Sequence, residues 1–328
     1  MSRPPHTEAL VEDRLVTLDE IRAARERIKG VAKVTPLVDV SNLAGRPLWL
    51  KCESMQPGGA FKIRGAYNMV AQLTDEERRR GVITYSSGNH GQAVAIAARA
   101  LGAPAVVVMP TTAPRIKSDG ARGFGAEIVF EGTTSLQRRA RAEAIAAARG
   151  LTMVPPFDHA WIIAGQGTLG LEILDQCRDV GTVLAPIGGG GLVSGVAAAI
   201  KQSTPHVTVI GIEPSGAASM KNAVDAGEVR TLEGANSIAD GLMAVRPGDL
   251  NFAHVRKYVD RIDMVDDTEI AAAVRWLFVN AKIVAEPSGA ATVAAALRAA
   301  ATYTPPVVAI VSGGNLSPED LGKYTEDR

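Results

Sequence analysis

A run of glycines in the second half of the sequence has the composition of an anion-binding loop. It follows an apolar, β-branched stretch and precedes an Ala-rich stretch of helical composition. Consecutive glycines let several backbone N–H groups converge on one anion, and a helix N-terminus adds the positive end of its dipole. No Gly-Lys-Ser/Thr follows, so this is not a Walker loop. We therefore expect one small phosphate to be bound by the backbone of Gly188, Gly189, Gly190, Gly191 and Leu192.

Lys62 lies in a segment that could carry a covalently bound cofactor. Small residues at 58–60 leave space around it, and Phe61 and Ile63 flank it with apolar side chains. An apolar helical period starts directly after it, so the lysine is expected at a helix N-terminus. An ammonium group in such an apolar niche is disfavoured, which predicts a lowered pKa. A neutral amine is what a lysine needs in order to form a Schiff base.

A third segment, Ser-Ser-Gly-Asn-His-Gly at 86–91, gathers polar side chains behind an apolar stretch at 82–85. Ligands of α/β proteins bind at the carboxyl ends of strands, where the following helix presents free N–H groups. A loop that only caps its helix needs fewer polar residues than this one has. The segment therefore predicts a site for a substrate carboxylate.

The elements that must position these segments form a regular alternation. Short β-branched runs alternate with Ala-rich stretches, which is typical of βαβ units on a parallel sheet. Thr17 and Thr74 begin helix capping boxes. The predicted fold class is α/β, with parallel sheets flanked by helices. The predicted strands are 82–85, 105–109, 127–130, 182–186, 207–212 and 307–311, and the predicted helices are 93–101, 134–149, 192–201, 268–282 and 288–299.

Composition excludes several classes of function. Of the 328 residues, 46% are hydrophobic and 21% are charged, as in an ordinary globular protein. The chain has 35 lysine and arginine residues and 35 aspartate and glutamate residues, so its formal net charge is zero. Aromatic residues make up only 4%. Because a nucleic-acid-binding protein usually has a basic surface and aromatic side chains for stacking, a nucleic-acid partner is not expected. No apolar run is long enough for a membrane span. The polar start of the chain and its two cysteines predict a cytoplasmic protein without a disulfide framework.

Six short motifs occur in one order along residues 16–316. They are Phe-Lys-Ile-Arg-Gly-Ala at 61–66, Ser-Ser-Gly-Asn-His at 86–90, Ala-Gly-Gln-Gly-Thr at 164–168, the glycines at 188–191, Glu-Pro-Ser-Gly at 286–289 and Ser-Gly-Gly-Asn at 312–315. Together they resemble the fold-type-II, tryptophan-synthase-β-like family of pyridoxal-phosphate enzymes, and within it the threonine/serine dehydratases and serine racemase. The resemblance implies pyridoxal 5'-phosphate as cofactor and an amino acid as substrate.

Carried over residue by residue, the resemblance implies a role for each matching position. Lys62 would hold the cofactor through a Schiff base and act in catalysis, and Phe61 would pack against the cofactor ring. Asn89 would hydrogen-bond the phenolic oxygen of the ring. The hydroxyl of Ser312 would face the pyridine nitrogen and leave it largely unprotonated, which favours elimination over transamination. The other implied cofactor contacts are Gly241, Glu286 and the loop from Gly188 to Leu192, and the implied substrate contacts are Ser86, Ser87, Asn89 and His90.

The sequence departs from this family pattern at two positions. Ala60 stands where this branch usually has a serine, so a hydroxyl near the cofactor is missing. Many relatives bind a cation through a glutamate, a main-chain carbonyl and an aspartate. Glu213 and Ala217 match the first two ligands, but Ser219 occupies the third position. A divalent or monovalent cation would therefore find an incomplete set of ligands.

The three βα units that start at Val82 predict a domain organisation, and the resemblance implies a homodimer. We expect a large cofactor-binding domain made of residues 1–79 and 159–328. A small domain made of residues 80–158 would form a lid over the substrate. Because the chain ends at Arg328, we expect no regulatory domain of the biosynthetic type.

Four functions are compatible with these residues. The favoured one is a threonine/serine ammonia-lyase, or dehydratase, that converts a β-hydroxy amino acid to a 2-keto acid and ammonia. Ser87 would lie opposite Lys62 and could protonate the other face of the substrate, which suits a serine racemase; threo-3-hydroxyaspartate dehydratases share the double serine. A β-replacement synthase usually has Asp-Arg after the lysine, where Ile63 and Arg64 stand here. A binding protein without activity is disfavoured by the intact lysine and glycine loop.

Overall fold

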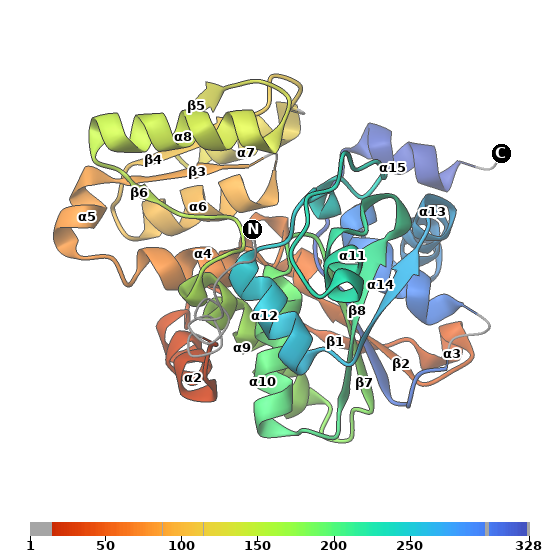
Figure 1. The fold of residues 1–328 in the computed structure, drawn as a ribbon. Coiled ribbons are helices and arrows are strands. Elements are labelled where there is room, and N and C mark those ends of the chain that lie inside the picture. Colours follow the sequence, from red (N-terminus) through yellow and green to blue (C-terminus); the bar gives the residue numbers. More distant parts are fainter. Residues whose placement is uncertain (1–14, 87, 114, 299–301, 327–328) are drawn as a thin grey trace.

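The computed structural model describes residues 15–86, 88–113, 115–298 and 302–326. Two separate sheets organise the chain, and they lie beside one another with helices between and around them (Figure 1). This confirms the predicted α/β class. No helix in the described ranges combines the length and the apolar character that a membrane span requires.

The larger sheet has six strands in the order β1-β2-β10-β7-β8-β9. Only β1 pairs antiparallel with its neighbour, and the other pairs are parallel. The central strands are buried along their whole length, as expected for a sheet covered on both faces. The strands are β1 (Leu37–Asp39), β2 (Leu48–Cys52), β7 (Thr182–Pro186), β8 (Thr208–Pro214), β9 (Arg261–Val265) and β10 (Val307–Val311).

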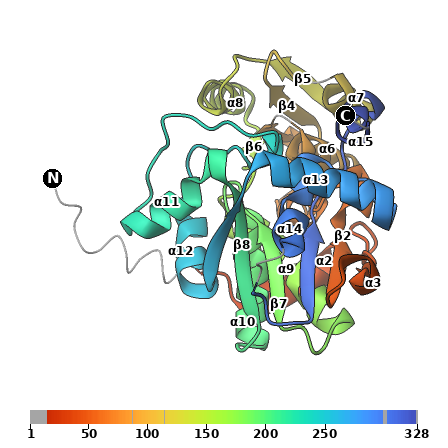
Figure 2. The ribbon, with the colours of Figure 1, turned by 90° about the vertical axis from the view of Figure 1, so that its right-hand side faces the viewer.

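Helices cover both faces of this sheet. One face packs against α13 and α14, and the other packs against α9, α10 and α12. The turned view shows α13 and α14 together beside the strands (Figure 2). The helices that follow or precede these strands are α2 (Leu18–Arg27), α3 (Ser41–Ala44), α9 (Ala160–Gln176), α10 (Gly191–Ser203), α11 (Ser219–Ala226), α12 (Asp249–Tyr258), α13 (Asp267–Trp276), α14 (Pro287–Leu297) and α15 (Pro318–Thr325).

The smaller sheet has four parallel strands in the order β5-β4-β3-β6. Helix α8 covers one face, and α6 covers the other together with α4. The strands are β3 (Val82–Tyr85), β4 (Ala105–Met109), β5 (Glu127–Phe130) and β6 (Thr152–Met153). The helices are α4 (Ile63–Val70), α5 (Asp75–Arg80), α6 (Asn89–Ala100), α7 (Arg115–Gly123) and α8 (Ser135–Arg149). All four strands lie within the predicted small domain, but its core also includes α4; the boundary at residue 80 stays a prediction.

Short helical turns complete the chain. They are η1 (Glu53–Met55), η2 (Pro57–Gly59), η3 (Ser215–Ala217), η4 (Asp240–Leu242) and the π-helical turn η5 (Leu277–Ala281). The last of these ends the helix predicted at 268–282: its α-helical part stops at Trp276, and Lys282 has a positive φ of 59°. Helix α6 starts at Asn89, four residues before the predicted start at 93, so Asn89 and His90 belong to its first turn.

Candidate active site

The predicted segments meet where the carboxyl ends of strands from both sheets face one another. Ser86 follows β3, Gly188 follows β7 and Ser312 follows β10. The segment that carries the lysine is joined to the last of these by a hydrogen bond from Phe61 N to Ser312 O (3.1 Å) and by the bridge between Ala60 and Gly313. Residues that are distant in the sequence therefore form one site.

Lys62 directly precedes α4, and its amine lies inside this site. Nζ donates a hydrogen bond to Pro156 O (2.8 Å) and is 5.1 Å from the centroid of the Phe61 ring. Burial of the amine lowers the pKa of Lys62 from 10.5 to about 8, because desolvation disfavours the ammonium form. At neutral pH, a far larger fraction of this amine is uncharged than in an ordinary lysine. The predicted lowering of its pKa agrees with this environment.

Asn89 is held by two partners that fix the orientation of its amide group. Nδ2 donates to Glu286 Oε1, and Oδ1 accepts from Asn315 Nδ2 (2.9 Å). A Cβ built on Gly313 would lie 2.2 Å from Glu286 Oε1 and 3.1 Å from Asn89 Nδ2, so the backbone of Gly313 closes this cluster. Burial raises the pKa of Glu286 to about 7, while the nearby Lys117 ammonium acts in the opposite direction.

The glycine loop has the properties of an anion cradle. Among the described residues, the backbone N–H groups of its four glycines have no hydrogen-bond acceptor, and three of the glycines are buried. Buried N–H groups without acceptors are rare in folded proteins, so they indicate a ligand that accepts from them. Gly241 lies against this loop, because a Cβ on Gly188 would be 3.1 Å from Gly241 O. Gly241 N in turn donates to Ser288 Oγ (2.8 Å).

Ser312 is buried and is 4% exposed. Its hydroxyl donates to Ser288 O at a distance of 3.4 Å. The partner is a neutral carbonyl, so the group that this position provides is a neutral hydroxyl.

The residues predicted to bind substrate have different environments. Ser86 Oγ accepts a hydrogen bond from Gly88 N (3.1 Å), whereas Ser87 lies outside the described residues.

The ring of His90 is oriented by a main-chain carbonyl. Its Nε2 is 3.1 Å from Val154 O, so this nitrogen carries the proton. The buried Nδ1 has no partner in the described part of the chain. Burial, together with the positive charge of Lys62, lowers the pKa of His90 to about 3. The imidazole is therefore neutral and cannot attract a carboxylate by charge.

Two charged residues at the site were not predicted from the sequence. Lys117 lies on α7, beside the smaller sheet. It forms an ion pair with Asp240 in η4, and η4 lies on the side of the larger sheet. A Cβ on Gly88 would lie 2.7 Å from Lys117 Cδ, so this side chain packs on the loop that precedes α6. The pair joins the two halves of the structure at the site. No motif connects residues 117 and 240, so sequence reasoning had no signal for it.

A buried ionic network anchors the helix that follows Lys62. Arg64 donates two hydrogen bonds to Glu53 (2.7 and 2.8 Å) and two to Glu172 (2.7 and 2.8 Å). Lys51 Nζ also donates to Glu172 Oε2 (2.8 Å). All four side chains are almost completely buried. The network connects α4 with η1 and α9, so it holds the segment that carries Lys62.

The residues considered for a cation have another role. Glu213 accepts hydrogen bonds from Met220 N (2.8 Å) and Lys221 N (2.9 Å) and thereby caps the first turn of α11. Burial raises the pKa of Glu213 to about 7. Within the described ranges, no group of three or more His, Cys, Asp or Glu side chains could hold a metal ion. A cation bound by Glu213 and the main chain of Ala217 stays a prediction.

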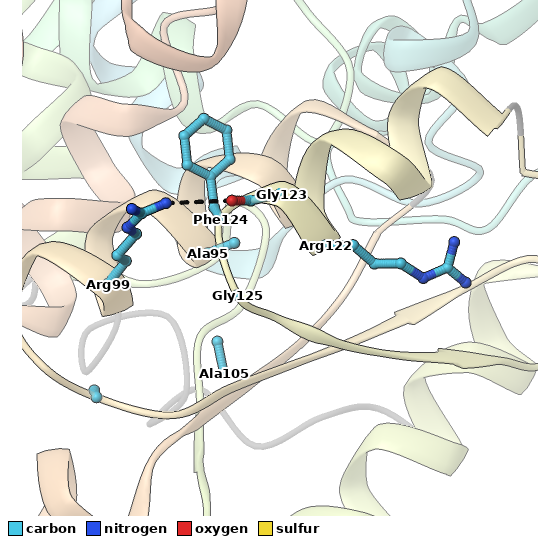
Figure 3. Close-up of a pocket in the computed structure, with 8 residues that line it drawn as sticks. Ala95, Arg99, Ala105, Arg122, Gly123, Phe124 and Gly125 are labelled. Atoms are coloured by element: carbon cyan, nitrogen blue, oxygen red, sulfur yellow. Dashed lines mark hydrogen bonds between the residues drawn. The ribbon is translucent and has the colours of Figure 1, made fainter.

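A pocket between the ends of α6 and α7 and the start of β4 is separate from this site. It is lined by Arg99, Arg122 and Phe124 among others, and Arg99 donates to Gly123 O (3.2 Å) (Figure 3). It includes Ala105, the first residue of β4, whereas Lys62 and its partners lie at the carboxyl ends of the strands. None of the predicted site residues lines it.

Comparisons with known proteins agree with this geometry. A family model described as pyridoxal-phosphate dependent enzyme matches residues 28–313. The L-threonine ammonia-lyase of Thermotoga maritima is 43% identical over 305 residues, which are 92% of this chain and 76% of that protein. A biosynthetic L-threonine dehydratase of Pasteurella multocida is 39% identical, and the match spans only 60% of its length. The structure of maize serine racemase matches with a TM-score of 0.90 and 38% identity, over 94% of this chain and 96% of that chain.

The residues present fit this cofactor. A lysine amine of lowered pKa can form the covalent link, and the buried N–H groups without acceptors suit a phosphate. The hydroxyl of Ser312 provides a neutral hydrogen-bonding group. The chain belongs to the family of pyridoxal-phosphate-dependent enzymes, and pyridoxal phosphate is its cofactor.

Proposed function

We propose that the protein is an ammonia-lyase that converts a β-hydroxy amino acid such as L-threonine or L-serine to a 2-keto acid and ammonia. The observation that carries this proposal is the Lys62 amine, whose pKa of about 8 leaves it able to accept a proton near neutral pH. The hydroxyl of Ser312 supports it, since a ring nitrogen beside a hydroxyl favours elimination. The similarity to a threonine ammonia-lyase points to the same reaction.

In this proposal, different residues of the chain bind the substrate and orient the cofactor. The first turn of α6 binds the substrate carboxylate through backbone N–H groups, because the ring of His90 is neutral and faces Val154. Asn89 and Ser312 orient the cofactor, and the glycine loop holds its phosphate. When bound, pyridoxal phosphate supplies an electron-withdrawing ring that stabilises negative charge at the substrate α-carbon.

Lys62 then removes the proton from the α-carbon as general base, and the carbonyl of Pro156 keeps its amine in place. The β-hydroxyl takes up one proton, which balances the one that Lys62 removes, and leaves as water when the carbon–carbon double bond forms. One water molecule is consumed when the released enamine hydrolyses, so each amino acid yields one 2-keto acid and one ammonia. No oxidant or reductant is required.

Racemisation is a second candidate function, and two observations favour it. The fold matches maize serine racemase over nearly its whole length. Ser87 stands in the sequence where a second acid could protonate the substrate from the face opposite Lys62. A threo-3-hydroxyaspartate dehydratase would share this double serine.

We expect Ser87→Ala to separate these reactions. The variant should retain elimination from the preferred L-substrate and lose any racemisation, because only racemisation needs a proton donor on the opposite face. The measurement is the amount of 2-keto acid and of D-amino acid formed from L-serine, L-threonine and threo-3-hydroxyaspartate. Ser86→Ala is the matched control and should lower both reactions alike. A wild-type protein that forms D-serine but no 2-keto acid would overturn the proposed elimination.

We also propose that the protein is a cytoplasmic homodimer in which residues 80–158 close over the substrate. The family resemblance supports the dimer. The ion pair between Lys117 and Asp240 supports closure, since it connects α7, beside the smaller sheet, with η4, on the side of the larger sheet. The balanced charge and the short apolar runs of the sequence support the location.

A further inference from the structure

The carbonyl of Gly189 is held outside the glycine loop by two donors. Gly248 N donates to it (3.1 Å), and Asn251 Nδ2 donates to it as well (2.9 Å). The peptide bond is planar and trans, so the N–H that follows a carbonyl points in the opposite direction. If the carbonyl of Gly189 faces α12, the N–H of Gly190 must face away from α12. Gly190 N is one of the N–H groups without an acceptor in the described structure.

The orientation of the Asn251 amide is determined by this contact. A flipped amide would bring its oxygen against the oxygen of Gly189, which would be repulsive. Asn251 is completely buried, and its Oδ1 has no partner among the described residues. A buried acceptor without a partner is costly. The hydrogen bond that Asn251 Nδ2 donates to Gly189 O explains why an asparagine stands here despite this cost.

Neighbouring residues keep both Asn251 and the loop in place. Gly190 has a positive φ of 101°, and a Cβ there would lie 2.9 Å from Asn251 Cβ. On another side, a Cβ on Gly189 would lie 2.4 Å from the ring of Phe157. The next residue, Asp158, accepts from the N–H groups of Asp249 and Leu250 (3.1 Å each) and so caps α12. The loop is thus packed between Phe157 and the first turns of α12.

We propose that Asn251 is a positioning residue that aims the N–H of Gly190 at the cofactor phosphate. The inference rests on the assignment of the glycine loop to that phosphate. Asn251 does not touch the phosphate; it acts through the peptide between Gly189 and Gly190. Affinity for the phosphate group should therefore depend on Asn251, while affinity for the rest of the cofactor should not.

The test compares the binding of pyridoxal phosphate and of pyridoxal, which lacks the phosphate, to apoenzymes. The variants are Asn251→Leu, which is similar in size and uncharged but has no donor, and Asn251→Ser, which is smaller and polar. We expect each to weaken binding of pyridoxal phosphate by about 10-fold, as expected for the loss of one hydrogen bond that supports the ligand's partner. Binding of pyridoxal should stay unchanged. The 31P NMR shift of the bound cofactor should also change.

His254→Leu is the matched control, because His254 is a buried polar residue of the same helix whose partners are Val16 N (2.9 Å) and Leu250 O (2.7 Å). It should preserve the ratio of the two affinities even if it lowers stability. If the Asn251 variants keep the wild-type ratio, Asn251 does not position the loop. If the wild-type protein itself binds both compounds equally, the assignment of the loop to the phosphate is wrong.

Discussion

A Lys62→Ala variant is expected to lose turnover by about 10⁴-fold or more, the upper range for the loss of a general acid–base group. The reason is that one amine both carries the cofactor and removes the α-proton. Its site desolvates the amine and lowers its pKa to about 8, and alanine can do neither task. The measurement is the rate of 2-keto acid release from L-threonine and L-serine at saturating cofactor.

The control for this substitution is Lys201→Ala. Lys201 belongs to α10 and pairs with Asp260 (2.8 Å), so its removal tests the loss of a lysine away from the site. The control should keep nearly full activity. If Lys62→Ala keeps as much activity as Lys201→Ala, another residue must be the base, and the proposed mechanism is wrong.

The largest effect on stability is expected for Arg64→Met. Methionine fills similar space but leaves Glu53 and Glu172 buried with only the Lys51 ammonium to compensate them. Removing one partner of a buried ion pair typically costs about 3–5 kcal/mol. We expect a loss of this size in the free energy of unfolding, measured by denaturant titration at one fixed cofactor concentration. The cofactor concentration must be fixed because a ligand of the folded state adds to apparent stability.

The matched control is Arg139→Met, which breaks an exposed ion pair with Glu143 (2.8 Å) on α8. Such a pair is worth about 0.3–0.5 kcal/mol. The two variants remove the same group, so their difference measures the effect of burial. An Arg64→Met protein that loses no more stability than the control would show that the buried network does not hold α4 in place.

Local signals predicted many of the elements correctly. Thr17 and Thr74 begin helices with capping boxes, and the strands at 82–85, 105–109, 127–130, 182–186 and 307–311 are present with these bounds. These features depend on neighbouring residues, so they are visible in the sequence. Helix α9 was not predicted. Most of its residues are buried against other helices, so its apolar residues do not show the one-sided period that identifies a surface helix.

Motifs in the sequence could indicate candidate site residues, whereas the partners of these residues depend on packing and could not be predicted. Lys62 and the glycine loop have recognisable surroundings in the sequence. The carbonyl of Pro156 could not be predicted as a partner of Lys62, because every residue has a carbonyl and only the fold brings this one within 2.8 Å. Asn251 was missed for a related reason, since it is separated from Gly189 by 62 positions. His90 was predicted as a substrate contact, but the direction of its ring depends on the position of Val154.

The central claim is that the cofactor is joined to Lys62. The most direct test is to reduce the wild-type protein with borohydride and to map the modified peptide by mass spectrometry. Reduction converts the carbon–nitrogen double bond of the link to a stable single bond, so the cofactor stays on the residue that held it. We predict one modified residue per chain, Lys62. Modification of Lys51 or Lys117 instead, or of no lysine at all, would contradict the assignment of this site.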